Sequence, residues 1–125
     1  MQQQAALAYQ QVAKQTGSPR DLEANLLSRA AANLQRIRED WEGSHDDLPN
    51  ALHFNRRLWN VFLTSATSED NPLPAVVRQN VANLGLFVMN HTLRTEIDPH
   101  AGMLDVLINI NRQLAAGLRA AQTAE

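Results

Sequence analysis

Residues 55–88 read NRRLWNVFLTSATSEDNPLPAVVRQNVANLGLFV, and this stretch decides the fold. Two apolar segments with helical spacing flank a polar loop, which closes on the sequence Asn-Pro-Leu-Pro at 71–74. Proline fixes φ and disfavours helix in the residue before it, so this element sets the angle at which the next helix begins. We therefore predict a rigid helical hairpin. Leu73, held between the two prolines, either packs onto the first turns of that helix or projects as a recognition knob, and packing is the favoured alternative.

The rest of the chain carries the same helical pattern. Apolar residues recur at a spacing of three and four, and no alternating strand pattern is present. We predict a single all-α domain over residues 1–125, a bundle of about five helices with no β-sheet. The predicted helices cover about residues 3–15, 19–42, 50–66, 75–94 and 100–120. Helix-start signals precede four of them, at Ser18-Pro19, Asp47-Leu48-Pro49, Leu73-Pro74 and Asp98-Pro99.

The fourth predicted helix is apolar nearly all round in its C-terminal half. Val77, Val81, Leu84 and Val88 form one line at helical spacing, and further large apolar residues widen it. A helix with this pattern either lies at the centre of a fold or has a second partner.

Composition excludes several classes of protein. At 125 residues and 44% hydrophobic content, the chain is long and apolar enough to bury a core. It has no cysteine, which excludes disulfides and cysteine nucleophiles and fits a reducing compartment. The N-terminus does not resemble a signal peptide, and the densest apolar run, 84–89, is too short to cross a bilayer. We therefore predict a cytoplasmic protein with no membrane association.

No catalytic, metal or cofactor site is predicted. The histidines at 45, 53, 91 and 100 lack the His-x-x-x-His spacing of a zinc site, and those at 45 and 100 are expected to be solvated. The acidic residues between 39 and 47 lack the pattern of a calcium loop, so they form a solvated face or pair with Arg56 and Arg57. No phosphate-binding glycine loop or nucleophile elbow is present. We therefore predict that the protein is not an enzyme.

Basic residues do not gather in one place. Only Arg56 and Arg57 are adjacent, and the formal net charge is -2. A nucleic-acid interface needs several phosphate contacts on one surface. Direct binding to RNA or DNA is therefore not expected.

Asparagines recur within the apolar helices. Asn55 lies among Leu52, Leu58 and Trp59 at helical spacing, and the others are Asn80, Asn83, Asn90, Asn109 and Asn111. A buried amide left unpaired costs about 1–3 kcal/mol, so any buried one needs a partner. Either the amides bond between helices and fix their register, or they line a groove that accepts another helix. The first alternative is favoured.

Several segments together resemble the FlaF family of alphaproteobacterial flagellar regulators. They are Ala8-Tyr9, SPRDLE at 18–23, NRRLW at 55–59, FLT at 62–64, DNPLP at 70–74, RQNVANL at 78–84 and LININ at 107–111. The resemblance implies a cytoplasmic role in flagellin export and in post-transcriptional control of flagellin, alongside a second regulator, FlbT, that is associated with the flagellin messenger.

The resemblance also implies partners. The predicted function is that of a flagellin-binding export chaperone or adaptor whose groove covers the amphipathic terminal helices of flagellin. The alternative is a regulator acting chiefly through FlbT or through flagellin mRNA, and a homodimer through the fourth helix is a further possibility. The candidate partner-binding surface comprises Asn55, Trp59, Phe62, Leu63, Leu73, Asn80, Asn83 and Phe87.

Overall fold

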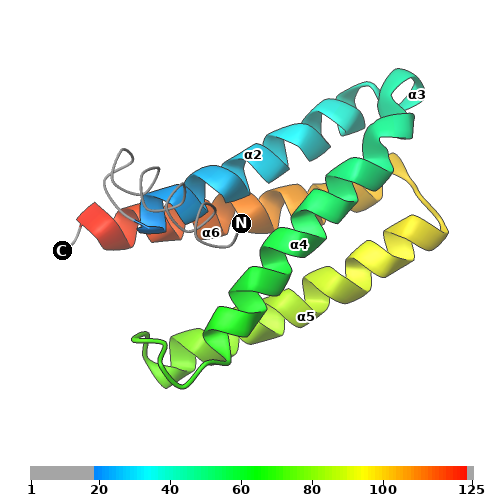
Figure 1. Ribbon diagram of the computed structural model, residues 1–125. Helices are drawn as coiled ribbons and strands as arrows, with labels where there is room; N and C mark the ends of the chain where they lie inside the picture. Colours follow the sequence, from blue (N-terminus) through cyan, green and yellow to red (C-terminus); the bar gives the residue numbers. More distant parts are fainter. Residues whose placement is uncertain (1–18, 124–125) are drawn as a thin grey trace, which may run out of the picture.

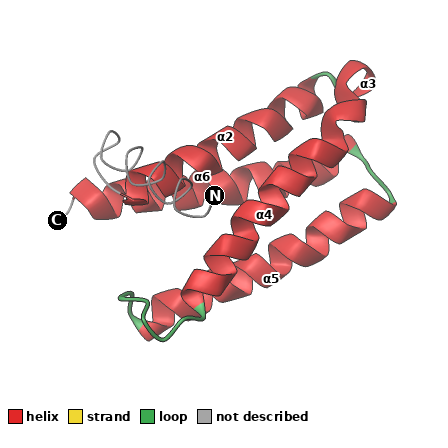
Figure 2. Cartoon of the chain, in the orientation of Figure 1, coloured by secondary structure: helices red, strands yellow, loops and turns green. Residues whose placement is uncertain are grey.

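Four long helices account for most of residues 19–123, which are the residues that the computed structural model describes (Figures 1 and 2). They are α2 (Pro19–Glu39), α4 (Leu48–Ala66), α5 (Ala75–Ile97) and α6 (Leu104–Thr123). A one-turn helix α3 (Trp41–Ser44) and the 3₁₀ turns η1 (His45–Asp47) and η2 (Ala101–Met103) connect them. No strand occurs within 19–123, which confirms the predicted all-α fold. The helix predicted over about 3–15 and the Ser18 cap lie outside the described residues.

Prolines mark two helix starts as predicted. Pro49 lies in the first turn of α4, and Pro74 immediately precedes α5. Other boundaries differ, and α5 and α6 each end about three residues later than predicted, at Ile97 and Thr123. The second predicted helix ends at Glu39 rather than near 42, because Asp40 leaves the helical region with φ -125° and ψ 58°. The last helix begins at Leu104 rather than near 100, because Asp98 terminates α5, its N–H donating to the Arg94 carbonyl, and a 3₁₀ turn follows.

The helices form two antiparallel pairs, α2 with α6 and α4 with α5 (Figure 1). Arg38 near the end of α2 pairs with Asp105 at the start of α6, and Arg119 near the end of α6 donates to Asn25 of α2. The pairs meet at the end that holds α3 and η2, where α4 also packs on α2. The core lies at this junction. Its largest fully buried apolar side chains are Leu27, Leu34, Ile37, Leu52, Trp59, Val88, Leu104 and Leu107.

α5 is peripheral, so the alternative that placed it at the centre of the fold is wrong. It packs mainly against α4 and contacts neither α2 nor α6 extensively. Its buried residues are Gly85, Val88, Thr92 and Thr95. Both threonines satisfy their hydroxyls within the helix, with Thr92 Oγ1 donating to the Val88 carbonyl at 2.6 Å. The buried positions of α5 are therefore a glycine, two threonines and a single large apolar residue, Val88.

The Arg38–Asp105 pair gives a prediction on pH. The Arg38 guanidinium donates to the Asp105 carboxylate at 2.9 Å and lowers the pKa of Asp105 below its usual 3.8. A depressed folded-state pKa means that the pair stabilises the fold above the unfolded pKa, and that this contribution is lost as pH falls through the folded value. The melting temperature of Asp105→Asn should therefore be slightly lower than wild type at neutral pH, a small effect because both groups are solvated. At a pH below the folded-state pKa of Asp105, Asp105→Asn and wild type should melt at the same temperature. A difference in melting temperature that persists at that pH would contradict this.

Candidate partner-binding surface

The structure separates the eight candidate residues into three groups. Asn55 and Trp59 are fully buried in the core, so they form no part of the molecular surface. Phe62, Leu63 and Leu73 are half-buried. Asn80, Asn83 and Phe87 are exposed on α5, with Phe87 40% accessible. The six candidates with accessible surface therefore lie on the last turns of α4, in the loop after it and on α5.

Asn55 and Trp59 belong to a buried chain of hydrogen bonds between α4 and α6. The indole N–H of Trp59 donates to Asn111 Oδ1 at 2.8 Å, and Asn111 Nδ2 donates to Asn55 Oδ1 at 2.6 Å. All three residues are 0% exposed. Since an indole can only donate, Trp59 fixes the orientation of the Asn111 amide, which in turn fixes that of Asn55. The chain is thus one continuous donor-to-acceptor series.

This network answers the question of the buried asparagines. Asn55 and Asn111 bond to each other across two helices, so for this pair the favoured alternative, interhelical bonding that fixes register, is what the structure has. Asn80, Asn83, Asn90 and Asn109 are exposed. Asn111 was named among the asparagines of the apolar helices, but nothing distinguished it from the exposed Asn109, although a signal was present. Asn111 interrupts the apolar stripe of α6 between Leu107 and Leu114, as Asn55 interrupts that of α4.

The loop between α4 and α5 is held by Asn71. Its Nδ2 donates to the Ser65 carbonyl at 3.0 Å, and its Oδ1 accepts from the Leu73 N–H at 2.9 Å. Arg78 of α5 donates to the Ser68 carbonyl at 3.2 Å. The loop is therefore tied to both helices, as expected of a rigid hairpin. Leu73 is half-buried, and its role as staple or knob stays a prediction.

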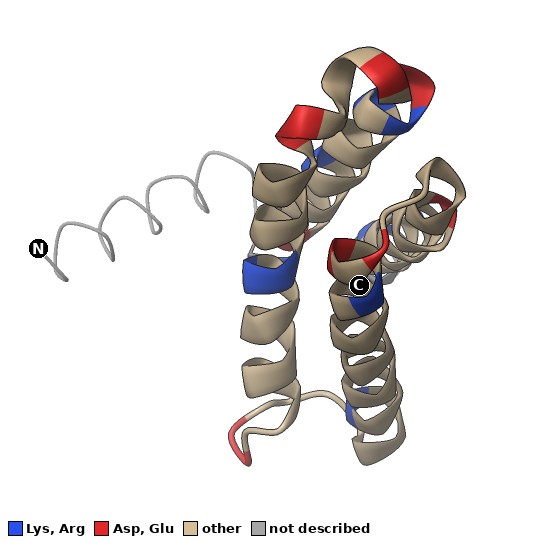
Figure 3. Cartoon of the chain, turned by 90° about the vertical axis from the view of Figure 1, so that its right-hand side faces the viewer, with Lys and Arg blue, Asp and Glu red and all other residues tan. Residues whose placement is uncertain are grey.

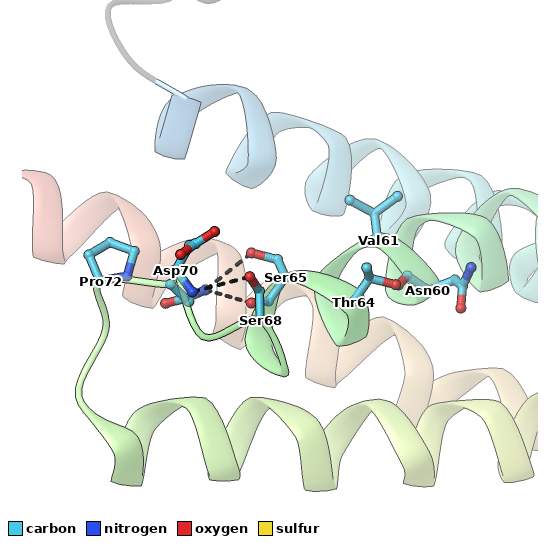
Figure 4. A pocket seen from close by; sticks show the side chains of 8 residues that line it. Asn60, Val61, Thr64, Ser65, Ser68, Asp70 and Pro72 are labelled. Atoms are coloured by element: carbon cyan, nitrogen blue, oxygen red, sulfur yellow. Dashed lines mark hydrogen bonds between the residues drawn. The ribbon is translucent and has the colours of Figure 1, made fainter.

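A shallow hollow lies between this loop and the second half of α4, both of which supply its lining residues (Figure 4). It has a volume of about 560 Å³ and none of the eight candidate residues lines it. Its polar groups already bond among themselves, with Thr64 Oγ1 donating to the Asn60 carbonyl and Asn71 bonding to Ser65. Asp70 is its only formally charged lining residue, and no histidine lies beside its hydroxyls. The hollow therefore offers no paired nucleophile and base.

The described residues contain no group of three His, Asp or Glu side chains that could hold a metal ion. His45 and His100 are exposed, as predicted, whereas His91 is half-buried and bonds through Nε2 to the Met103 carbonyl at 2.7 Å. The acidic cluster between 39 and 47 is solvated, one of the two alternatives considered. The other alternative, pairing of this cluster with Arg56 and Arg57, is wrong for Arg56. Arg56 pairs instead with Glu96 of α5 at 3.2 Å, because the antiparallel hairpin brings the two residues together.

Large apolar side chains are exposed almost entirely on α5. Among the described residues, eight large hydrophobic side chains are exposed, and seven of them belong to this helix. They are Val76, Val77, Leu84, Leu86, Phe87, Leu93 and Ile97. Apart from Val88, the residues that α5 buries fully are thus glycine and threonine, and most of its large apolar residues are at least partly exposed.

The middle of α5 also lacks charge. Between Arg78 and Arg94 the helix carries no Lys, Arg, Asp or Glu, so its central turns are uniformly uncharged in Figure 3. The polar residues interspersed there are mainly amides, and Gln79 donates to Asn83 Oδ1 at 3.0 Å. An uncharged helix surface of about four turns matches a partner surface that is itself apolar.

Two stripes run along α5. Each is made mainly of apolar residues, some of them half-buried, and neither includes Val76 or Ile97. The Phe87 stripe consists of Val77, Asn80, Leu84 and Phe87, and the Leu86 stripe consists of Ala82, Leu86, Met89 and Leu93. At 3.6 residues per turn their centres lie roughly 160° apart, with the α4 contact on one side between them. The Phe87 ring stacks on His91 at 5.6 Å, and His91 bonds to the carbonyl of Met103. The Phe87 stripe is therefore the one on the η2 side of the helix.

None of the helices within 19–123 has the length and apolar character needed to cross a membrane. No match was found among curated proteins or among solved structures. The family model described as flagellar protein FlaF, in contrast, matches residues 5–118. Because that match covers most of the 125 residues, the chain belongs to the FlaF flagellar protein family, which is not a family of enzymes.

Proposed function

We propose that the protein is a flagellum biogenesis factor that binds flagellin as a non-enzymatic export chaperone or adaptor, with its occupancy coupled to post-transcriptional control of flagellin synthesis. Family membership supports the flagellar role. The observation that carries the binding role is the exposure of large apolar side chains on α5, which no other described helix covers. An unpolymerised amphipathic helix needs an apolar surface of this kind to shield it.

The Phe87 stripe is the proposed contact for flagellin. The side chains of Val77, Leu84 and Phe87 are 37–41% exposed. Each is therefore partly held by contacts within the protein and still offers apolar surface to a partner. Their spacing of seven and three residues matches the anchors of one amphipathic helix laid along another. Phe87 is the central anchor, because its ring is already held by stacking on His91 and loses little freedom on binding.

The arrangement of charge favours flagellin over RNA as the direct ligand. Several arginines are engaged within the fold: Arg29 lies over the Phe54 ring, and the ion pairs are Arg36–Asp47, Arg38–Asp105 and Arg56–Glu96. The central turns of α5, where the apolar surface lies, carry no positive charge. A phosphate-binding surface would need several uncommitted basic groups together.

Titration calorimetry of the folded protein against monomeric flagellin tests the proposal. We expect a stoichiometric complex, and we expect Phe87→Glu to raise the dissociation constant about 30-fold or more, since loss of an aromatic anchor costs about 2 kcal/mol and each 1.4 kcal/mol is tenfold. Ala116→Glu is the matched control, because it adds the same carboxylate to an exposed position of α6. Both variants should keep wild-type helicity.

Two results would count against the proposal. Absence of heat at tens of micromolar with folded wild-type protein would show that flagellin is not the ligand. Binding to flagellin leader RNA, weakening steeply as salt rises, would favour the alternative that the protein acts through the messenger or through FlbT.

A further inference from the structure

The Leu86 stripe has the spacing of a coiled-coil seam. Ala82, Leu86, Met89 and Leu93 follow one another at intervals of four, three and four residues. This is the a/d repeat through which two helices interlock along their length. Leu86 and Leu93 are 58% and 54% exposed, whereas Ala82 and Met89 are half-buried and Met89 also packs against the core, so the two leucines are the open part of the seam. It lies on the side of α5 away from the Phe87 stripe and does not depend on the flagellin contact.

When two copies of the seam run antiparallel, small side chains of one copy lie opposite large side chains of the other. Pairing Leu86 of one copy with Met89 of another also places Ala82 opposite Leu93, a small residue against a large one, in both directions. The same register sets Gln79 opposite Glu96 at each end. A parallel pairing would instead place Ala82 opposite Ala82 and leave a gap there.

The flanks and ends of the seam are complementary as well. Asn83 and Asn90 lie along its solvent side, and the antiparallel register brings them near each other, so that amides rather than like charges meet. At both ends, Arg78 of one copy comes level with the region of Glu96 of the other. Glu96 is already paired with Arg56, so a further arginine would extend that pair into a network across the interface.

We propose that the Leu86 stripe of α5 is a self-association surface that pairs antiparallel with the same stripe of a second copy of this chain. The two α4–α5 hairpins then form one four-helix arrangement, in which the large residues that α4 leaves exposed become core. Two stripes of this length bury less than a standard interface of about 1,600 Å², so the dimer is expected to be weak, with a micromolar dissociation constant. The Phe87 stripe stays free for flagellin.

Single-cysteine variants test this arrangement, since the chain has no cysteine of its own. Oxidising a mixture of Ala82→Cys and Leu93→Cys should yield a disulfide-linked dimer containing one of each, because their backbones face each other within disulfide range. Each variant alone should link at least tenfold less, because its own two copies lie roughly 16 Å apart along the axis. Asn80→Cys, on the Phe87 stripe, is the control and should not link efficiently.

Sedimentation equilibrium at roughly 100 µM gives the second measurement. Wild-type protein and Phe87→Glu should both sediment as dimers, whereas Leu86→Glu/Leu93→Glu should be a folded monomer that still binds flagellin. A wild-type monomer at this concentration overturns the proposal, as does linking of Ala82→Cys to itself as efficiently as to Leu93→Cys. If Leu86→Glu/Leu93→Glu abolishes flagellin binding in a chain that is always monomeric, the stripe belongs to flagellin and not to a second copy.

Discussion

Replacing Asn111 by alanine should lower the free energy of unfolding by about 3 kcal/mol. The change removes the acceptor for the Trp59 indole and the donor for Asn55 Oδ1, and both of these groups are fully buried. A buried polar group without a partner costs about 1–3 kcal/mol, and Asn55 Nδ2 already has none among the described residues. For a chain of this size, the loss corresponds to a fall of roughly 10 °C in melting temperature. Chemical denaturation followed by circular dichroism measures it.

Asn109→Ala is the matched control for this experiment. It removes the same side chain from the same helix two residues earlier, at an exposed position, and should change stability by less than about 0.5 kcal/mol. A double-mutant cycle with Asn55→Ala should show strong coupling, because the first substitution already leaves Asn55 Oδ1 unpaired. Equal and small effects of Asn111→Ala and Asn109→Ala would mean that the amide chain does not hold α4 against α6.

The sequence predicted those features of the fold that depend on neighbouring residues, such as the helix starts. α4 and α5 begin where Pro49 and Pro74 require, since proline restricts its own backbone and that of the residue before it. The end of α2 at Glu39 was missed, because Asp40 can extend a helix or leave it, and the outcome depends on how α3 docks.

The candidate surface was predicted less well, for a physical reason. An apolar face at helical spacing indicates that another segment packs against it. It does not indicate whether that segment belongs to the same chain or to a partner. Trp59 and Asn55 are covered by α6 through Asn111, a residue 52 and 56 positions away. Phe87, with an equally apolar setting, is left partly open because α4 lies against a different side of α5. Choosing between these outcomes requires the three-dimensional placement of α6 and α4.

The side chain of Leu63 on α4 approaches α5 closely at Gly85. A Cβ built there would stand 2.5 Å from Leu63 Cγ and 2.6 Å from Leu63 Cδ2, so the two helices approach each other where Gly85 leaves room for Leu63. With a larger residue at 85, Leu63 could not occupy its present place, and either its side chain or α5 itself would have to shift.

Gly85→Val should therefore destabilise the protein by about 3 kcal/mol, at the upper end of the usual range for overpacking. Leu63→Ala alone should cost about 2 kcal/mol through the cavity it leaves, less than a fully buried site because Leu63 is half-buried. The two changes add and remove three carbons at one contact, so the double variant should recover at least about 1 kcal/mol relative to the sum of the single losses. Leu58→Ala combined with Gly85→Val provides the control, because Leu58 packs against the core at another position of α4 and should show near-additive losses.

Hydrogen exchange can locate the effect of Gly85→Val. Because α5 packs mainly against α4, loosening that contact should expose the amides of α5 before those of α2 and α6, whose mutual packing is unchanged. The same variant should bind flagellin more weakly although Phe87 is intact, since the Phe87 stripe would no longer be held on a fixed helix. Uniform loss of protection across all four helices would contradict the view that α5 is an arm supported by α4. If Gly85→Val increases hydrogen exchange in α5 alone and also weakens flagellin binding, the contact between Gly85 and Leu63 couples the stability of the α4–α5 hairpin to partner binding.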